Sequence, residues 1–457
     1  MNKALLLNVK NLSISFGNTK NSVEAVHSIS FHINRNEILG VVGESGSGKS
    51  VTAMTILGLL SKKESLVSGE LLFEGQDLLK QTNEHIRKVR GSKIAMIFQE
   101  PMTALNPSMT CGEQVSEIIR LHLKQPKSKI KKEVISLFKK VKLPRPDEIY
   151  NSYPHQISGG QMQRVMIAMA IACKPKLLIA DEPTTALDVT VQKEIIALLK
   201  EIQKETKMSL LFISHDLGLV SQIADRTLVM YQGNIVEEGT VHEIFKAPKK
   251  TYTKALMSSR PGLKGRLKVL PTISSLAKKE FNPIEITPQE RAFKHKYIYT
   301  KTPILEILNI KKEYYSDAGF LNKKKIVKAV DDISFKVFEG ETLGLVGESG
   351  CGKSTLGRVI LQLDKSTSGS IKYKDKELTT LSSNELRKLR KDIQLIFQDP
   401  YSSLNPRMLI GETIMEPMQV HQIGKNDRER KNKVISILKS VKLDASFFNR
   451  YPHELSG

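Results

Sequence analysis

Cysteine is scarce in this sequence, with three residues among 457: Cys111, Cys173 and Cys351. Their spacing contains no Cys-x-x-Cys element, so we expect neither a disulfide framework nor a zinc site. No apolar run approaches the ~18 residues that a membrane-spanning helix requires. Asn8 and Lys10 interrupt the apolar start of the chain before it is long enough for a signal peptide. These absences predict a cytosolic protein that does not itself cross a bilayer.

Acidic residues are fewer than basic ones. The sequence has 48 Asp and Glu and 70 Lys and Arg, which gives a formal net charge of +22. Half of this excess lies in residues 246–301, where 14 Lys and Arg face 3 Asp and Glu. Prolines punctuate the same stretch and its end, so we expect a basic, largely irregular connector over residues 263–300. The charge permits either a solvated linker or a patch for nucleic acid, an anionic membrane or an acidic partner, and the irregular course favours the linker.

Two glycine-rich loops, 43–50 and 347–354, share the pattern Gly-Glu-Ser-Gly-x-Gly-Lys-Ser. Each follows a run of strand character, at residues 37–42 and 341–346. The backbone N–H groups of such a loop and the positive end of the following helix bind a polyphosphate. The loop lysine then reaches the β- and γ-phosphates, and the last serine binds Mg²⁺. The residues expected to form the two phosphate sites are Gly43, Ser45, Gly46, Gly48, Lys49, Ser50, Gly347, Ser349, Gly350, Gly352, Lys353 and Ser354.

The loops belong to a long internal repeat. Gly347 follows Gly43 by 304 residues, and Gln398 follows Gln99 by 299. A period near 300 residues is too long for a solenoid and indicates a duplicated domain. We therefore predict a first domain over residues 1–262, the connector over 263–300 and a second domain over 301–457.

Each repeat begins with short alternating strands, at 12–16 and 28–33 in the first, and continues as strand, loop and helix. That order predicts an α/β fold with a mixed open sheet covered by helices. From Pro107 to about Tyr153 the apolar spacing becomes helical, which predicts a helical subdomain.

Further motifs follow the first loop in a fixed order. They are Phe98–Pro107, Ile157–Gln161, Lys176–Pro183, Ala186–Asp188, Phe212–Asp216, Met230–Gly239 and Tyr252–Leu256. Together they resemble the ATP-binding subunit of an ABC transporter, and the first and the last two are similar to the dipeptide/oligopeptide importer branch. The resemblance implies tandem P-loop ATPase domains, each with a β-subdomain and a helical subdomain, that use ATP and Mg²⁺. It also implies permease subunits and a solute-binding protein as partners, no specific nucleic acid, and a place on the inner face of the cell membrane.

The acidic pair Asp181 and Glu182 follows Leu177–Ala180, an apolar run suited to a parallel strand covered on both faces. Such a strand brings both carboxylates to the edge of the sheet where open α/β folds bind ligands. Asp181 is expected to hold Mg²⁺ through water, and Glu182 to polarise the attacking water.

Other candidate residues follow from the neighbouring motifs. Gln99 is expected to contact the metal and the attacking water, and Gln398 in the second repeat the metal and the nucleotide. His215 is expected to donate to the γ-phosphate, although alone it could be an ordinary surface histidine. Phe16 and Tyr314 occupy matching positions and either stack on adenine or serve as core or surface aromatics.

Residues 158–161 begin a helix whose backbone amides form an anion site. In the family this segment, here Ser158, Gly159, Gly160 and Gln161, closes over the nucleotide that the other domain binds. ATP is then an interface ligand between paired domains.

The second repeat reaches only Leu455–Gly457, its match to the start of that helix. Asp181 follows Ser158 by 23 residues, so its counterpart would lie beyond the last residue. We therefore expect an unstable second domain with an inactive second site, and a first domain that pairs with the first domain of another copy. A fragment of a longer fused subunit is the alternative.

A soluble ATPase acting on ribosomes or nucleic acid is the rival function, which the charge would suit, but the importer-like tail and the connector favour transport.

Overall fold

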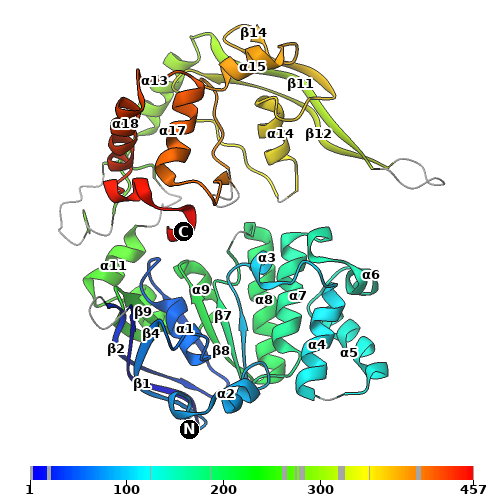
Figure 1. Ribbon diagram of the computed structural model, residues 1–457, viewed down its shortest axis with the longest axis vertical. Coiled ribbons are helices and arrows are strands. Elements are labelled where there is room, and N and C mark those ends of the chain that lie inside the picture. Colours follow the sequence, from blue (N-terminus) through cyan, green and yellow to red (C-terminus); the bar gives the residue numbers. More distant parts are fainter. Residues whose placement is uncertain are drawn as a thin grey trace. The chain divides into compact units, whose positions relative to one another are not determined.

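The structure is a computed structural model that describes residues 4–17, 22–123, 125–185, 187–259, 265–272, 275–276, 284–316, 325–348, 350–397 and 403–455. Ser349, Gln398 and part of the expected connector lie outside these residues. The chain divides into two compact units, residues 1–287 and 288–457 (Figure 1). None of the helices described is both long and apolar enough to span a membrane.

The first unit begins with an antiparallel sheet in the order β2-β1-β4-β5. Its strands are β1 (Leu5–Phe16), β2 (Val23–Asn34), β4 (Ser65–Phe73) and β5 (Gln76–Asp77). Alternate side chains of β1, including Leu7, Val9, Leu12 and Ile14, are buried, as expected for a strand with one face on the core. The two strands predicted at 12–16 and 28–33 are confirmed within β1 and β2.

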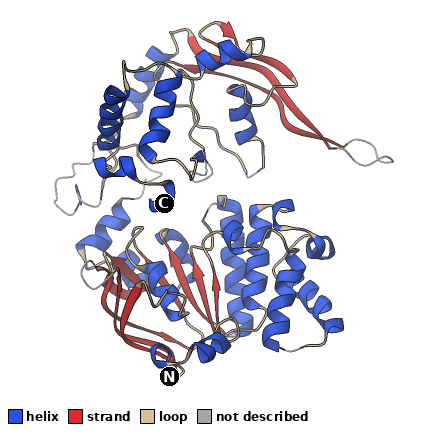
Figure 2. Cartoon of the chain, in the orientation of Figure 1, coloured by secondary structure: helices blue, strands red, loops and turns tan. Residues whose placement is uncertain are grey.

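A six-stranded mixed sheet in the order β10-β9-β3-β8-β7-β6 forms the centre of the first unit (Figure 2). Its strands are β3 (Ile38–Val42), β6 (Ile94–Ile97), β7 (Leu177–Asp181), β8 (Ser209–Ser214), β9 (Arg226–Tyr231) and β10 (Asn234–Thr240). Only β10 runs antiparallel to its neighbour. Every residue of β3, β7 and β8 is buried, which explains their continuous apolar sequences. Because these strands are parallel, their carboxyl ends meet at one edge of the sheet.

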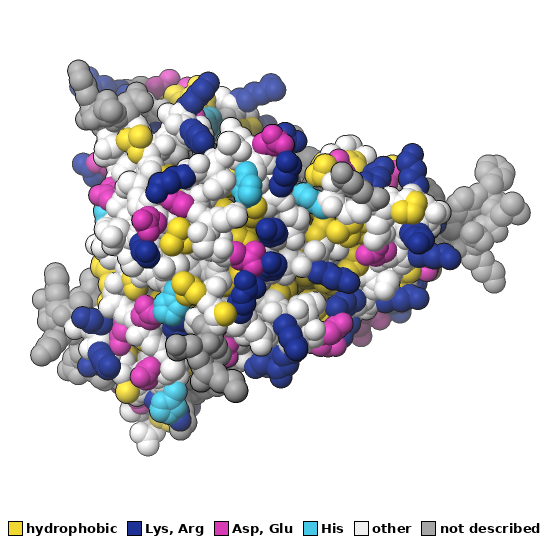
Figure 3. All heavy atoms as spheres, turned by 90° about the horizontal axis from the view of Figure 1, so that it is seen from below, with side chains coloured by type: hydrophobic (Ala, Val, Ile, Leu, Met, Phe, Trp, Pro, Cys, Tyr) yellow, Lys and Arg dark blue, Asp and Glu magenta, His cyan; other side chains and the backbone are white. Residues whose placement is uncertain are grey.

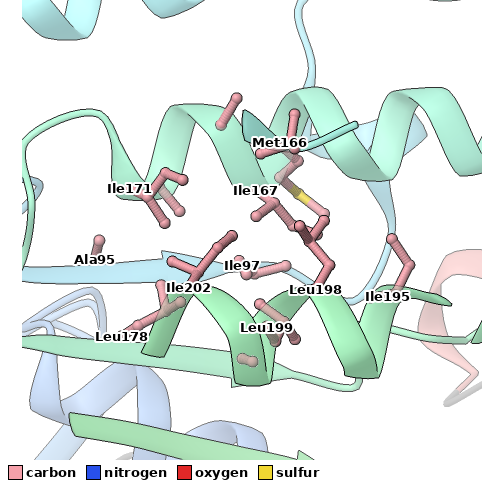
Figure 4. Packing of buried hydrophobic residues seen from close by; sticks show 14 of the residues in the cluster. Ala95, Ile97, Met166, Ile167, Ile171, Leu178, Ile195, Leu198, Leu199 and Ile202 are labelled. Carbon is pink, nitrogen blue, oxygen red and sulfur yellow. The ribbon is translucent and has the colours of Figure 1, made fainter. Parts of the chain in front are cut away.

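Helices cover this sheet and form the predicted helical region. Side chains of α7 (Gly159–Ile171) and α8 (Val189–Thr206) pack with β6 and β7 in one hydrophobic cluster (Figure 4). Each large aliphatic side chain buried there contributes about 1.5–3 kcal/mol to stability. The other helices of this unit are α1 (Lys49–Ile56), α2 (Asn83–Val89), α3 (Pro101–Ala104), α4 (Cys111–Leu123), α5 (Lys127–Lys140), α6 (Pro146–Asn151), α9 (Leu217–Ile223), α10 (Val241–Lys246) and α11 (Thr251–Ser258). The helical periodicity predicted between Pro107 and Tyr153 is confirmed by α4, α5 and α6.

The second unit contains an antiparallel sheet in the order β12-β11-β13-β14. Its strands are β11 (Pro303–Ser316), β12 (Lys325–Phe338), β13 (Ser368–Tyr373) and β14 (Lys376–Glu377). Its helices include α13 (Pro288–Ile298), α14 (Lys353–Ile360), α15 (Ser383–Leu389), α17 (Ile410–Val420) and α18 (Asp427–Ser440). Two small hydrophobic clusters replace the extended core of the first unit, one around Ile307 and Ile371 and the other around Val434 and Leu438.

Two expectations from the sequence are wrong. The run at 341–346 forms no strand, and its side chains are exposed: Leu343 by 46%, Leu345 by 54% and Val346 by 91%. In the first unit the equivalent strand, β3, lies between β8 and β9. Among the described residues no strand pairs with the run at 341–346, so it joins no ladder there. The connector is also less irregular than expected, because residues 288–298 form α13.

Exposure at 341–346 predicts an order of proteolytic cleavage. Chymotrypsin should cut after Leu343 or Leu345 before it cuts after Leu39 or Phe212, since the latter two lie in buried strands that must open first. Mass spectrometry of early digestion products measures this order. Cuts at Leu39 or Phe212 that appear as early as those at Leu343 would contradict the assignment.

Candidate functional site

The first phosphate loop joins the end of β3 to the start of α1. Gly46 and Gly48 have φ of 77° and 95°, a region that disfavours residues with a Cβ. The ammonium Nζ of Lys49 is folded into this loop, where it donates to the carbonyl oxygens of Gly43 at 2.9 Å and Glu44 at 2.7 Å. Lys49 is only 5% exposed, and this burial lowers its pKa. The loop therefore holds a buried cation on carbonyl oxygens that an anionic ligand could replace.

Asp181, the last residue of β7, faces the start of α1. Its Oδ1 accepts a hydrogen bond from Ser50 Oγ at 3.1 Å. Burial raises the pKa of Asp181 to about 6, because the charged form loses solvation. A hydroxyl beside a poorly solvated carboxylate is an oxygen donor set of the kind that Mg²⁺ prefers, so these two residues fit the ion that the sequence implies.

The carboxylate of Glu182 contacts its own turn and two other segments of the chain. Its Oε2 accepts hydrogen bonds from Gln99 Nε2 at 3.1 Å and Thr185 Oγ1 at 2.9 Å, and it lies 3.0 Å from His215 Nδ1. Gln99 follows β6 and His215 follows β8, so the strands on either side of β7 deliver these two groups. Glu182 itself has φ of 46°, which is strained for a side chain of this kind.

Glu182 and His215 shift each other's protonation. Burial alone would raise the pKa of Glu182, but the contacts with His215 and Thr185 outweigh it and the pKa is lowered. The hydrogen bond to Glu182 in turn raises the pKa of His215. The arrangement thus keeps the Glu182 carboxylate ionised.

The start of α7 is a capped helix terminus. Ser158 Oγ accepts from the Gln161 amide at 3.3 Å, and Gln161 Oε1 accepts from the Ser158 amide at 2.9 Å. No hydrogen bond among the residues described links Ser158–Gln161 to the group around Glu182. Phe16 packs, partly buried, against the core under the first sheet.

The second loop repeats the geometry of the first. Lys353 Nζ donates to the carbonyl oxygens of Gly347 at 2.7 Å and Glu348 at 2.6 Å. Gly350 and Gly352 have φ of 79° and 97°, close to the values in the first loop. Tyr314 is exposed, lies under the Lys312 ammonium at 4.9 Å and donates to Asp364 at 3.3 Å.

Sequence reasoning missed two contacts of the first site. Thr185 lies three residues after Glu182 in a turn, a spacing that could have suggested a hydroxyl within reach of the carboxylate. Tyr252, quoted above only for its resemblance to an importer tail, contacts the phosphate loop through the amide of Glu44. No local pattern signals that contact, because the two residues are far apart in the chain.

Residues 26–185 and 330–457 match the family described as ABC transporter. The chain belongs to the ABC transporter family. This ABC ATPase is 46% identical over 463 residues to the glutathione import ATP-binding proteins GsiA of Shigella sonnei strain Ss046 and Escherichia coli strain K12. Each comparison covers 99% of this chain and 73% of the relative. A solved ATP-binding cassette, a dimer bound to ADP and Pi, is 26% identical, with a TM-score of 0.47 over 52% of this chain and 99% of that one.

The raised pKa of Asp181 predicts how the site responds to pH. Without a cation, ionising this buried carboxylate costs free energy. The neutral form of Asp181 therefore stabilises the folded state at low pH, and this stabilisation is lost as pH rises through about 6. A cation bound to the carboxylate removes that cost. The extra thermal stabilisation that Mg²⁺ gives to the ATP-loaded protein should therefore be large at pH 7.5 and decline as pH falls through about 6.

Thermal unfolding with ATP, with and without Mg²⁺, measures this effect across the pH range. In Asp181→Asn the increment from Mg²⁺ should be small and independent of pH. An increment that falls equally in both proteins would place the titrating group elsewhere.

Proposed function

We propose that this ABC ATPase binds and hydrolyses ATP to energise an importer of glutathione or another short peptide. The observation that carries the proposal is the 46% identity to glutathione import ATP-binding proteins, which extends over 99% of the chain and so includes both repeats. The convergence of Gln99, Thr185 and His215 on Glu182 supplies the hydrolytic chemistry.

In this proposal the first site divides hydrolysis among its residues. Lys49 leaves the carbonyls of its loop and contacts the β- and γ-phosphates. Ser50 and Asp181 hold Mg²⁺, which when bound neutralises charge on the phosphates. Glu182 accepts a proton from the attacking water, and the strained backbone at this residue fixes its position. Gln99 orients that water, and His215 stabilises the charge of the γ-phosphate.

ATP bound in this way has one open side, which the amides of a second ABC domain would cover. Residues 158–161, at the start of α7, carry the amides and positive helix end for that contact. We assign residues 1–262 and 301–457 to two nucleotide-binding domains joined by the connector 263–300. First domains of two copies pair through this contact, and Gly347–Ser354 with Gln398 forms the second nucleotide site.

An apolar recess of ≈ 210 Å³ is the proposed docking site for a permease subunit. It lies beside the loop that carries Gln99, and its lining includes Leu59, Phe98, Ile118, Met166 and Met169. On the face seen in Figure 3, hydrophobic side chains lie in hollows bordered by Lys and Arg side chains. A segment docked here would press on the loop between β6 and α3 and so couple permease movement to the position of Gln99. The subunit would then be held on the inner face of the membrane, with a solute-binding protein delivering cargo from the other side.

Reconstitution with the permease subunits and solute-binding protein of the same transport system tests the proposal. Liposomes with ATP enclosed should accumulate labelled glutathione or a short peptide, and Glu182→Gln should abolish uptake. Leu59→Glu should reduce permease co-purification by about tenfold or more, because it places a charge in the apolar recess, while ATP binding is retained.

Val23→Glu is the matched control, since Val23 is an exposed residue of β2 outside the recess. It should leave both co-purification and uptake unchanged. Uptake that survives Glu182→Gln would refute the proposed chemistry, and permease binding unaffected by Leu59→Glu would refute the docking site.

A further inference from the structure

The outer side of the first phosphate loop is braced by the turn between β9 and β10. The Gly233 amide donates to the Ser47 carbonyl at 3.2 Å. Gly43 lies so close to this turn that a Cβ on it would be 2.2 Å from the carbonyl oxygen of Met230. The loop is therefore fixed from behind by backbone that follows it by almost 200 residues.

The tail after this turn adds a side chain to the brace. Tyr252, in α11, places its hydroxyl oxygen 3.4 Å from the Glu44 amide, which donates to it. The ring of Tyr252 packs on Tyr231, the last residue of β9, with 4.2 Å between centroids. The Glu237 carboxylate holds the start of the tail helix, because it accepts from the amides of Lys249 at 2.7 Å and Lys250 at 3.1 Å. Tyr252 is thus held on both sides while its hydroxyl meets the loop.

The hydroxyl of Tyr252 is a neutral group under ordinary conditions. Burial is the main cause that raises its pKa to about 12. A proton therefore stays on the oxygen throughout the range in which an ATPase is assayed, and the oxygen is available as an acceptor for the Glu44 amide.

We propose that Tyr252 is a positioning residue that holds the Glu44 peptide in the shape the nucleotide-loaded loop needs. The carbonyl of the same peptide unit belongs to Gly43, and Lys49 Nζ already holds it at 2.9 Å in this structure. The inference rests on the proposed function, in which Lys49 leaves that carbonyl for the phosphates. Once the lysine has moved, the contact with Tyr252 remains to hold the same peptide, so its loss would affect the loaded loop more than the empty one.

Pre-organisation of a loop lowers the free energy that is lost when a ligand orders it. Tyr252→Phe keeps the ring on Tyr231 but leaves the Glu44 amide without its acceptor. One hydrogen bond of this kind corresponds to an affinity loss of about two- to tenfold. The change should appear in the Kd and KM for Mg·ATP, with little change in kcat, because Tyr252 does not contact the groups around Glu182.

The test is a titration of the full chain with a fluorescent ATP analogue and Mg²⁺, together with steady-state ATPase kinetics and the Tm of the nucleotide-free protein. Tyr231→Phe is the matched control, since it removes a hydroxyl from the stacked partner ring. Tyr252→Phe should weaken nucleotide binding at unchanged Tm, and Tyr231→Phe should match the wild type.

Equal Kd values for Tyr252→Phe and the wild type would overturn the inference. Equal weakening in both variants would also overturn it, because ring packing would then be responsible in place of the hydroxyl. A wild-type chain that does not bind the analogue would instead refute the proposed function, so the two failures are distinct.

Discussion

The carboxylate of Glu182 joins parts of the chain that are far apart in sequence. It accepts hydrogen bonds from the loop after β6 and from its own turn, and it pairs with the histidine after β8. The neighbouring Asp181 connects the same strand end to the helix that follows the phosphate loop. The strands that carry these groups, β3, β6, β7 and β8, are parallel members of one sheet. The register of that sheet therefore determines whether the groups meet. The chemistry proposed for the first unit depends on this meeting point.

The charged groups of the site are paired with other groups of the chain. Lys49 lies on loop carbonyls, and His215 lies on Glu182. In the proposed function a triphosphate and a water take the place of these internal partners when the nucleotide binds. Buried charges require such partners, because an unpaired one costs several kcal/mol. In the same proposal the contacts of Gly233 and Tyr252 with the loop are kept when the nucleotide binds.

The local elements of the site could be predicted from sequence because each has a short-range cause. Glycines at positive φ, an apolar run before an acidic pair and Ser158 three residues before Gln161 all act within a few residues. The same reasoning failed at residues 341–346, which are apolar enough for a buried strand but have no partner strand in the part of the chain that the structure describes. It failed also at α13, where Pro288 occupies the first turn of a helix and does not break one. The contact of Tyr252 with Glu44 depends on tertiary packing and has no local signal.

The contact between His215 and Glu182 can be measured directly by NMR titration of the imidazole in the nucleotide-free protein, with the signal assigned by substitution of His215. The account predicts that His215 of the wild type titrates above its ordinary pKa, because the Glu182 carboxylate stabilises the imidazolium. In Glu182→Gln the pKa of His215 should fall, because its hydrogen bond with the carboxylate, the largest cause that raises this pKa, is removed. Identical titration of His215 in the two proteins would show that the carboxylate and the imidazole do not meet, and would contradict the site described above.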